Sequence, residues 1–220
     1  ALRRLQGAIE GRSGEHGIAV LMRYTLRLLT LQQFQRAAAL MCACETIRRV
    51  DIAKWGETPF RLGLWVGNKT TPNTLASAAS SLLQSNVGGR PSSTGTPHQI
   101  TSCPWCGSSI REQHLLVFEA PSDIGRCVTY CGDNLGRCEF TAKQAPKEGL
   151  PVMVVDEEIY RRPPSLLIAT VDKFAQMPWK GQTQMLFGKV NAICDRHGFL
   201  SPEIDDTQSH PSRNGLPRVT

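Results

Sequence analysis

The sequence predicts a mixed α/β fold in which a parallel sheet carries a cysteine-rich insertion, and two features indicate this. The run Leu166–Val171 is apolar without interruption, as expected of a parallel strand buried on both faces, and a helical segment opening with Asp172 and Lys173 follows it. The eight cysteines are clustered rather than spread along the 220 residues. Because the sequence has no secretory features, this clustering favours metal ligands over disulfides.

Composition sets the broad class of the protein. A chain with 40% hydrophobic residues can bury one sizeable core. The net charge of +6 is a modest basic excess, which permits an anionic partner such as nucleic acid without requiring one. No apolar run approaches the length of a membrane span and nothing resembles a signal peptide, so we expect a cytoplasmic protein.

The first strand-to-helix junction carries basic and hydroxyl side chains. Ile18–Met22 reads as a short buried strand, and a helix is expected from Leu26 to about Val50. Arg23, Thr25 and Arg27 lie where a helix N-terminus presents free N–H groups, and they could grip a phosphate there. The alternative that they simply solvate the edge of the sheet stays open.

The middle of the chain predicts one more strand and a linker. Arg61–Gly67 has the composition of a third strand, and Thr74–Leu83 that of a short helix. Residues 84–99 are rich in Gly, Pro, Ser and Thr, which is typical of a flexible connector.

A zinc-binding insertion is predicted after the connector. A C-x2-C pair followed by Gly107 is a strong zinc-knuckle signal, because the turn aims both thiolates at one ion and glycine takes the positive φ. The predicted ligands are Cys103, Cys106, Cys131 and Cys138. The competing set has Cys127 in place of Cys138. Four thiolates leave no open position, so the zinc would be structural.

Asp156 and Glu157 follow an apolar run that opens with Pro151. This pattern can present a magnesium-binding carboxylate in a nucleotide-hydrolysing fold. Because a proline opens the run and Pro163-Pro164 soon follow, we expect instead that these carboxylates are solvated and precede a turn.

Two strand ends resemble motifs of superfamily-two helicases. The strand Ile18–Met22, with Thr25 and Arg27 and then Leu29-Thr30-Leu31-Gln32, resembles motif Ia, and the string Ala169–Lys173 resembles motif Ib. The resemblance implies that both motifs hold the nucleic-acid backbone. By this resemblance, the residues expected to bind the nucleic-acid backbone are Arg23, Thr25, Arg27, Thr170, Asp172 and Lys173. Of these, Asp172 is expected to cap its helix.

Three longer strings look most like the large helicase subunit of DISARM bacterial anti-phage defence systems: Met22–Phe34, Cys103–Gly107 and Pro164–Trp179. The resemblance implies a RecA-like motor lobe, ATP-driven movement on DNA and a partner subunit in antiviral defence. It also implies that ATP and Mg²⁺ are cofactors of the parent protein.

The phosphate-binding loop of such motors, Gly-x-x-x-x-Gly-Lys-Ser/Thr, does not occur in this sequence. In the family the Asp-Glu box follows motif Ib, so the order of motifs rejects Asp156 as the magnesium ligand. We therefore expect a fragment, with the phosphate loop before Ala1, the Asp-Glu box after Thr220, and no ATP hydrolysis by this piece alone.

The predicted domains combine these elements. They are a first part of the RecA-like lobe (1–83), a flexible linker (84–99), a zinc-binding insertion (100–145), a return to the lobe (146–195), and a loop or disordered tail (196–220). The leading hypothesis is a DNA-gripping part of a helicase. The rival is a zinc-ribbon interaction module for nucleic acid or protein that has no motor activity.

Overall fold

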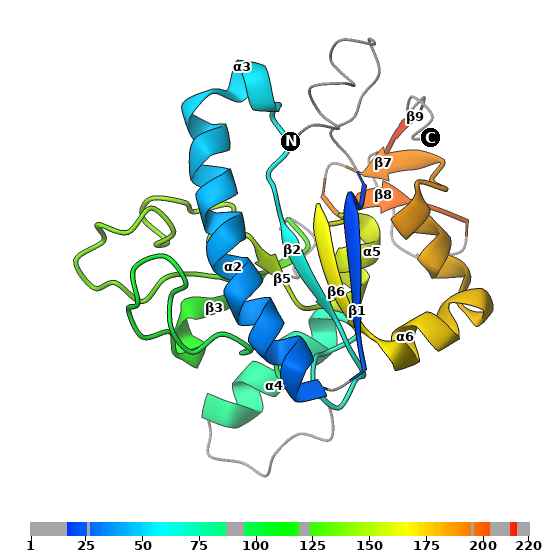
Figure 1. The fold of residues 1–220 in the computed structure, drawn as a ribbon, viewed down its shortest axis with the longest axis horizontal. Coiled ribbons are helices and arrows are strands. Elements are labelled where there is room, and N and C mark those ends of the chain that lie inside the picture. The colour runs from blue at the N-terminus through cyan, green and yellow to red at the C-terminus, as the bar shows by residue number, and fades with distance from the viewer. Residues whose placement is uncertain are drawn as a thin grey trace.

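The computed structural model describes residues 17–25, 27–86, 95–118, 124–194, 196–202 and 212–214. Its main sheet has four parallel strands, shown in Figure 1, in the order β1 (Val20–Tyr24), β6 (Leu166–Thr170), β2 (Leu62–Trp65) and β5 (Val152–Met153). The predicted parallel sheet is therefore confirmed. The short strand β5 adds a fourth member after Pro151, where the sequence indicated only an apolar run.

β6 lies between two neighbours and is buried along its whole length, as its uninterrupted apolar run predicted. β1 differs from the expectation of a buried strand. It is an edge strand in which Val20 is 50% exposed and Arg23 is also exposed. It also begins later than predicted, because pairing with β6 starts where the amides of Ala19 and Val20 donate to the carbonyl of Ser165.

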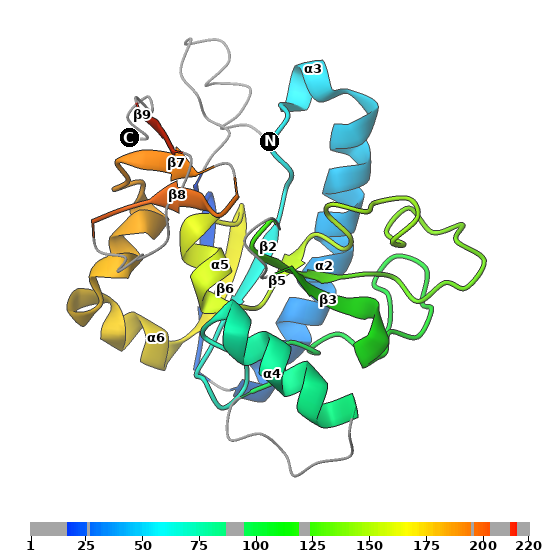
Figure 2. The same cartoon turned by 180° about the vertical axis from the view of Figure 1, so that it is seen from behind.

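Helices cover both faces of the sheet. α2 (Arg27–Val50) packs on one face, where Phe34, Leu64 and Ile168 belong to one hydrophobic cluster. α5 (Asp156–Arg161) and the 3-10 helix η3 (Gly181–Phe187) lie over the other face, where Trp65 and Leu167 belong to a second cluster (Figures 1 and 2). Successive residues of β6 thus alternate between the two cores, as strand geometry requires.

The insertion lies between β2 and β5 in the sequence, and Figure 2 shows it on the near side of α2, next to β5. The described residues of the insertion include a hairpin in which β3 and β4 pair antiparallel. The elements between β2 and β5 are α4 (Leu75–Asn86), η1 (Glu112–His114), β3 (Leu115–Phe118) and β4 (Arg126–Thr129), whereas the short helix α3 (Ile52–Trp55) precedes β2. The part of the predicted connector at 87–94 falls outside the described residues.

The segment after β6 contains more structure than predicted. α6 (Val171–Gln176) and η2 (Met177–Trp179) follow β6 directly. A three-stranded antiparallel sheet then forms from β7 (Ala192–Cys194), β8 (Gly198–Leu200) and β9 (Ser212–Asn214). Two of these strands, β8 and β9, lie in residues 196–220, where the sequence suggested a loop or disordered tail. Among the described helices none has the length and apolarity needed to cross a bilayer.

Candidate nucleic-acid edge and cysteine cluster

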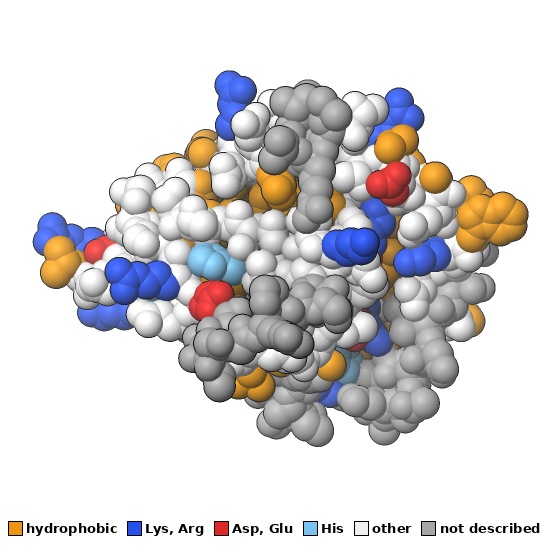
Figure 3. Space-filling view, turned by 90° about the horizontal axis from the view of Figure 1, so that it is seen from below, with side chains coloured by type: hydrophobic (Ala, Val, Ile, Leu, Met, Phe, Trp, Pro, Cys, Tyr) orange, Lys and Arg blue, Asp and Glu red, His pale blue; other side chains and the backbone are white. Residues whose placement is uncertain are grey.

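The two helicase-like junctions lie side by side at one edge of the sheet. β1 and β6 are parallel and in register to their last residues, with Arg23 opposite Ala169 and Tyr24 opposite Thr170. The segments leaving both strands therefore start from neighbouring positions. Figure 3 views the molecule from this end and shows Lys and Arg side chains more often than Asp and Glu.

The residues predicted at the first junction differ in how far they reach solvent. Arg23, near the end of β1, and Thr25, which follows that strand, are both exposed. Arg27 is the first residue of α2, and its side chain lies outside the described part of the structure. At least two of the three predicted side chains thus stand at the surface beside the N-terminus of a long helix.

The residues predicted at the second junction are more deeply placed. Thr170 is buried and precedes the first turn of α6 as its N-cap residue. Asp172 is exposed within that turn, so the expectation that Asp172 caps the helix is wrong.

Lys173 points into the protein rather than into solvent. Its side chain is 4% exposed, its ammonium pairs with Asp156, and it lies 5.6 Å from the centre of the Trp65 ring. Burial lowers the pKa of Lys173 and raises that of Asp156, while the opposite charge of each partner resists both shifts. A contact between Lys173 and a phosphate stays a prediction, and the ammonium is engaged elsewhere in this structure.

Of the two carboxylates that the sequence suggested to be solvated, Asp156 is buried and Glu157 is only partly exposed. Asp156 is 3% exposed and Glu158 is 1% exposed. Glu158 accepts hydrogen bonds from the guanidinium of Arg126 at 2.8 Å and from the amide of Cys127 at 3.2 Å. The correction has a physical cause: α5 packs between the main sheet and η3, and buried cations supply partners that are far away in the sequence.

The structure gathers four cysteines into one cluster, and they are the four predicted ligands. The Sγ atoms of Cys103, Cys106, Cys131 and Cys138 all lie within 4.8 Å of one another. The Sγ atoms of Cys106 and Cys131 are 3.4 Å apart, and those of Cys103 and Cys138 are 4.0 Å apart. This cluster could hold a metal ion.

Two glycines allow the cluster to form. Gly107 has a φ of 79° and donates its amide to the carbonyl of Cys103, which closes the knuckle turn. A Cβ atom on Gly132 would lie 1.9 Å from the carbonyl oxygen of Ser109, so only glycine lets the two halves of the cluster approach this closely.

The donor set fits zinc. Four thiolates at about 2.3 Å from a tetrahedral Zn²⁺ would be about 3.8 Å from one another, which is close to the separations found here. Burial opposes ionisation of Cys106, but hydrogen bonds with Ser108 outweigh it and lower the pKa of this thiol to about 7. An ionisable thiol among three neighbouring thiols suits a closed structural site.

The other cysteines lie apart from this set. Cys127 is on β4 and packs with Leu75, Ala78 and Val155, which agrees with its treatment as the spare cysteine. Cys42 is fully buried on α2 in the same hydrophobic cluster as Cys103 and Cys138, where it packs as a small apolar side chain.

The chain is similar to a curated protein, the DISARM protein DrmA of Bacillus paralicheniformis. The two are 36% identical over 198 residues, which cover 88% of this chain and 17% of that protein. The chain thus spans about a sixth of the length of the relative that it matches. No family model matches the sequence. The similarity confirms the predicted closeness to a DISARM protein.

Proposed function

We propose that this relative of DrmA forms the DNA-binding part of the first, RecA-like motor lobe of an ATP-dependent helicase in bacterial anti-phage defence. The observation that carries the proposal is the register of β1 and β6, which brings the two helicase-like junctions to neighbouring positions on one sheet edge. The similarity to a DISARM protein supports the defence role.

In the proposed complex, the protein contacts the sugar-phosphate backbone of the DNA. Arg23 would neutralise phosphate charge on the DNA strand, and Thr25 and Thr170 would position phosphates through hydroxyl or amide groups. None of these residues would read the base sequence. Arg27 would add a charge at the N-terminus of α2. Lys173, paired with Asp156, would act by fixing the second junction unless the pair opens.

The remaining parts of the proposed motor belong to the longer protein. ATP with Mg²⁺ would supply the energy for movement, and this sequence contains no phosphate-binding loop of the usual pattern. The four clustered cysteines would hold a structural zinc ion, and a partner subunit of the defence system would act with the helicase.

The experiment compares DNA binding by the chain and by two double variants, using mixed-sequence oligonucleotides at low salt. Arg23→Ala with Thr25→Ala is expected to lower affinity by about tenfold or more, because both side chains are exposed at the proposed grip. Arg111→Ala with Arg137→Ala, both exposed in the insertion, is the matched control and should change affinity little.

The same pair of variants tests the rival zinc-ribbon module. The insertion exposes Trp105 and Leu135 at its surface, which a binding module could use. If the loss of affinity follows Arg111 and Arg137 rather than Arg23 and Thr25, the insertion is the binding surface and the helicase-like grip is refuted.

A further inference from the structure

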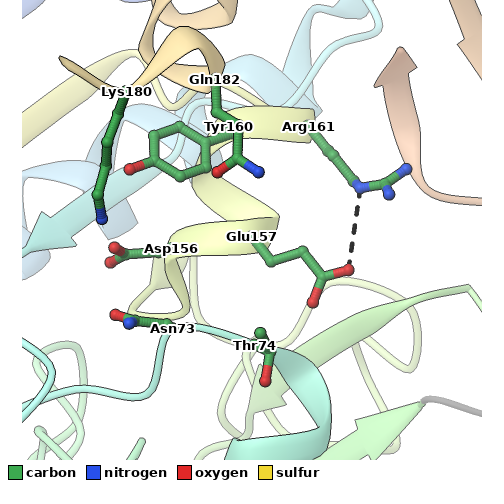
Figure 4. A pocket seen from close by; sticks show the side chains of 8 residues that line it. All are labelled: Asn73, Thr74, Asp156, Glu157, Tyr160, Arg161, Lys180 and Gln182. Atoms are coloured by element: carbon green, nitrogen blue, oxygen red, sulfur yellow. Dashed lines mark ion pairs between the residues drawn. The ribbon is translucent and has the colours of Figure 1, made fainter. Parts of the chain in front are cut away.

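A polar pocket opens beside the start of α5, between that helix and the segment that follows η2. Its volume is about 280 Å³. Figure 4 shows the side chains that matter for its chemistry, which come from three separate parts of the chain. They are Asn73, Asp156, Glu157, Tyr160, Lys180 and Gln182.

Two buried acceptors in this pocket are without donors. One oxygen of Asp156 pairs with Lys173, but its Oδ1 atom accepts no hydrogen bond, and neither does Oδ1 of Asn73. The nearby indole N–H of Trp65 is used elsewhere, since it donates to the hydroxyl of Tyr160 at 3.1 Å. Buried polar atoms are almost always paired, so two orphan acceptors lining one pocket indicate a ligand that donates hydrogen bonds.

The charge around Asp156 disfavours a metal ion as that ligand. Lys173 pairs with its carboxylate, and Lys180 lines the same pocket. Both oxygens of Glu157 are engaged, because Oε2 accepts the amide of Leu75 at 3.0 Å and Oε1 pairs with the guanidinium of Arg161 at 3.9 Å. A divalent cation would face two ammonium groups with only one carboxylate oxygen to bind.

The order of hydrogen-bond donors and acceptors along the pocket matches one edge of one nucleobase. In Figure 4 the carboxylate of Asp156 lies between the ammonium of Lys180 on one side and the amide of Asn73 on the other. The pocket therefore presents one donor followed by two acceptors. Guanine presents the complementary order along its Watson–Crick edge: the O6 acceptor, the N1–H donor and the N2 amine donor.

We propose that this pocket binds the Watson–Crick edge of guanine. O6 accepts from Lys180, N1–H donates to Asp156, and the N2 amine donates to Asn73. Adenine and cytosine would place an amine against the ammonium of Lys180, and uracil would place its O2 acceptor against Oδ1 of Asn73, so all three are disfavoured. The base is either a free guanine nucleotide or an unpaired guanine of a bound strand, and the first source does not depend on the proposed strand grip.

The test is a calorimetric titration of the whole chain with GMP, IMP, AMP, CMP and UMP. GMP is expected to bind at least about tenfold more tightly than AMP, CMP or UMP, as one or more well-placed base contacts would give. IMP lacks the N2 amine and should bind about fivefold more weakly than GMP. Equal affinities, a preference for another base, or no GMP binding at millimolar concentration would overturn the proposal.

Variants at the rim test the assignment without breaking the buried ion pair. Asn73→Ala should abolish the difference between GMP and IMP, and Lys180→Met should weaken both nucleotides together. The matched controls are Asn191→Ala and Lys189→Met, whose side chains are exposed outside the pocket and which should leave the preference intact. An unchanged GMP–IMP difference in Asn73→Ala would refute the contact.

A second arm identifies the source of the base. An oligothymidine with one central guanine is compared with the same strand lacking it. Tighter binding of the guanine strand, lost in Asn73→Ala, identifies a base of the strand as the ligand. If the strands bind equally while GMP binds, the pocket takes the free nucleotide. If neither strand binds but GMP does, the pocket stands and the proposed strand grip fails.

Discussion

Lys173 and Asp156 form a buried ion pair that ties the helix after β6 to the helix after β5. The two side chains are each 4% exposed, and the ammonium also lies over the ring of Trp65. A cation expected at the surface thus lies in the protein interior, beneath the edge at which strand binding is proposed.

Removing one partner of this pair should destabilise the fold. Lys173→Met leaves a buried carboxylate without its charge partner, which is expected to cost about 3–5 kcal/mol of unfolding free energy in urea denaturation. The double variant Lys173→Met with Asp156→Leu should recover most of that loss. If Lys173→Met instead keeps full stability and loses DNA affinity, the lysine serves the phosphate and not the fold.

Arg126 should be a second sensitive position. Its side chain is 2% exposed and bonds to Glu158, Glu148 and the carbonyl of Lys147. Arg126→Met leaves the fully buried Glu158 without its charge partner. We expect it to lower the unfolding free energy by about 3–5 kcal/mol in urea denaturation. Arg111→Met, at an exposed arginine of the same insertion, provides the comparison and should be close to neutral.

Glu148 should contribute stability that is lost in acid. Burial alone would raise the pKa of Glu148, but the charges of Arg126 and Arg61 outweigh burial and hold the pKa below its ordinary value. The contribution is therefore fully present above the unfolded pKa and disappears as pH falls through the lower, folded value. Chemical denaturation at pH 7 and at successively lower pH should show a flatter acid limb for Glu148→Gln, whereas Glu112→Gln should retain the slope.

Zinc content should follow the four-cysteine cluster. Metal analysis of the purified chain is expected to find about one zinc ion, and a serine at Cys103, Cys106, Cys131 or Cys138 should remove it. Cys127→Ser should keep the metal, because that residue lies on β4 away from the cluster. Zinc lost from Cys127→Ser but kept in Cys138→Ser would restore the competing ligand set.

The contacts that Arg23 makes with DNA should depend on salt and not on sequence. If Arg23 contacts a phosphate, Arg23→Ala should reduce the slope of log affinity against log salt by about one and act equally on unrelated sequences. Fluorescence anisotropy over a salt series measures this slope. Arg137→Ala is the control, and an effect confined to one sequence would contradict a backbone contact.

Local sequence patterns predicted those parts of the fold that depend on local chemistry. The apolar run of β6, the helical period of α2 and the knuckle turn ending at Gly107 each carry their structure in a few neighbouring residues. The cysteine set could be chosen because ligand number and spacing restrict it.

Contacts between residues far apart in the sequence determined the features that local patterns did not predict. The inward position of Lys173 depends on Asp156, 17 residues earlier, and the burial of Glu158 depends on Arg126. β1 is exposed because it lies at the edge of the sheet. The order of the strands in a sheet cannot be predicted from the sequence of any single strand. The pocket beside Asp156 combines Asn73 and Lys180, which share no motif.

The hydrophobic cluster beneath α2 joins the cysteine insertion to the main sheet. It contains Cys103, Cys131 and Cys138 together with Phe34, Leu64 and Ile168. Any ion held by these thiolates therefore sits against the same apolar wall that supports β6. Oxidants or metal starvation that remove the ion would therefore loosen the packing beneath both β1 and β6.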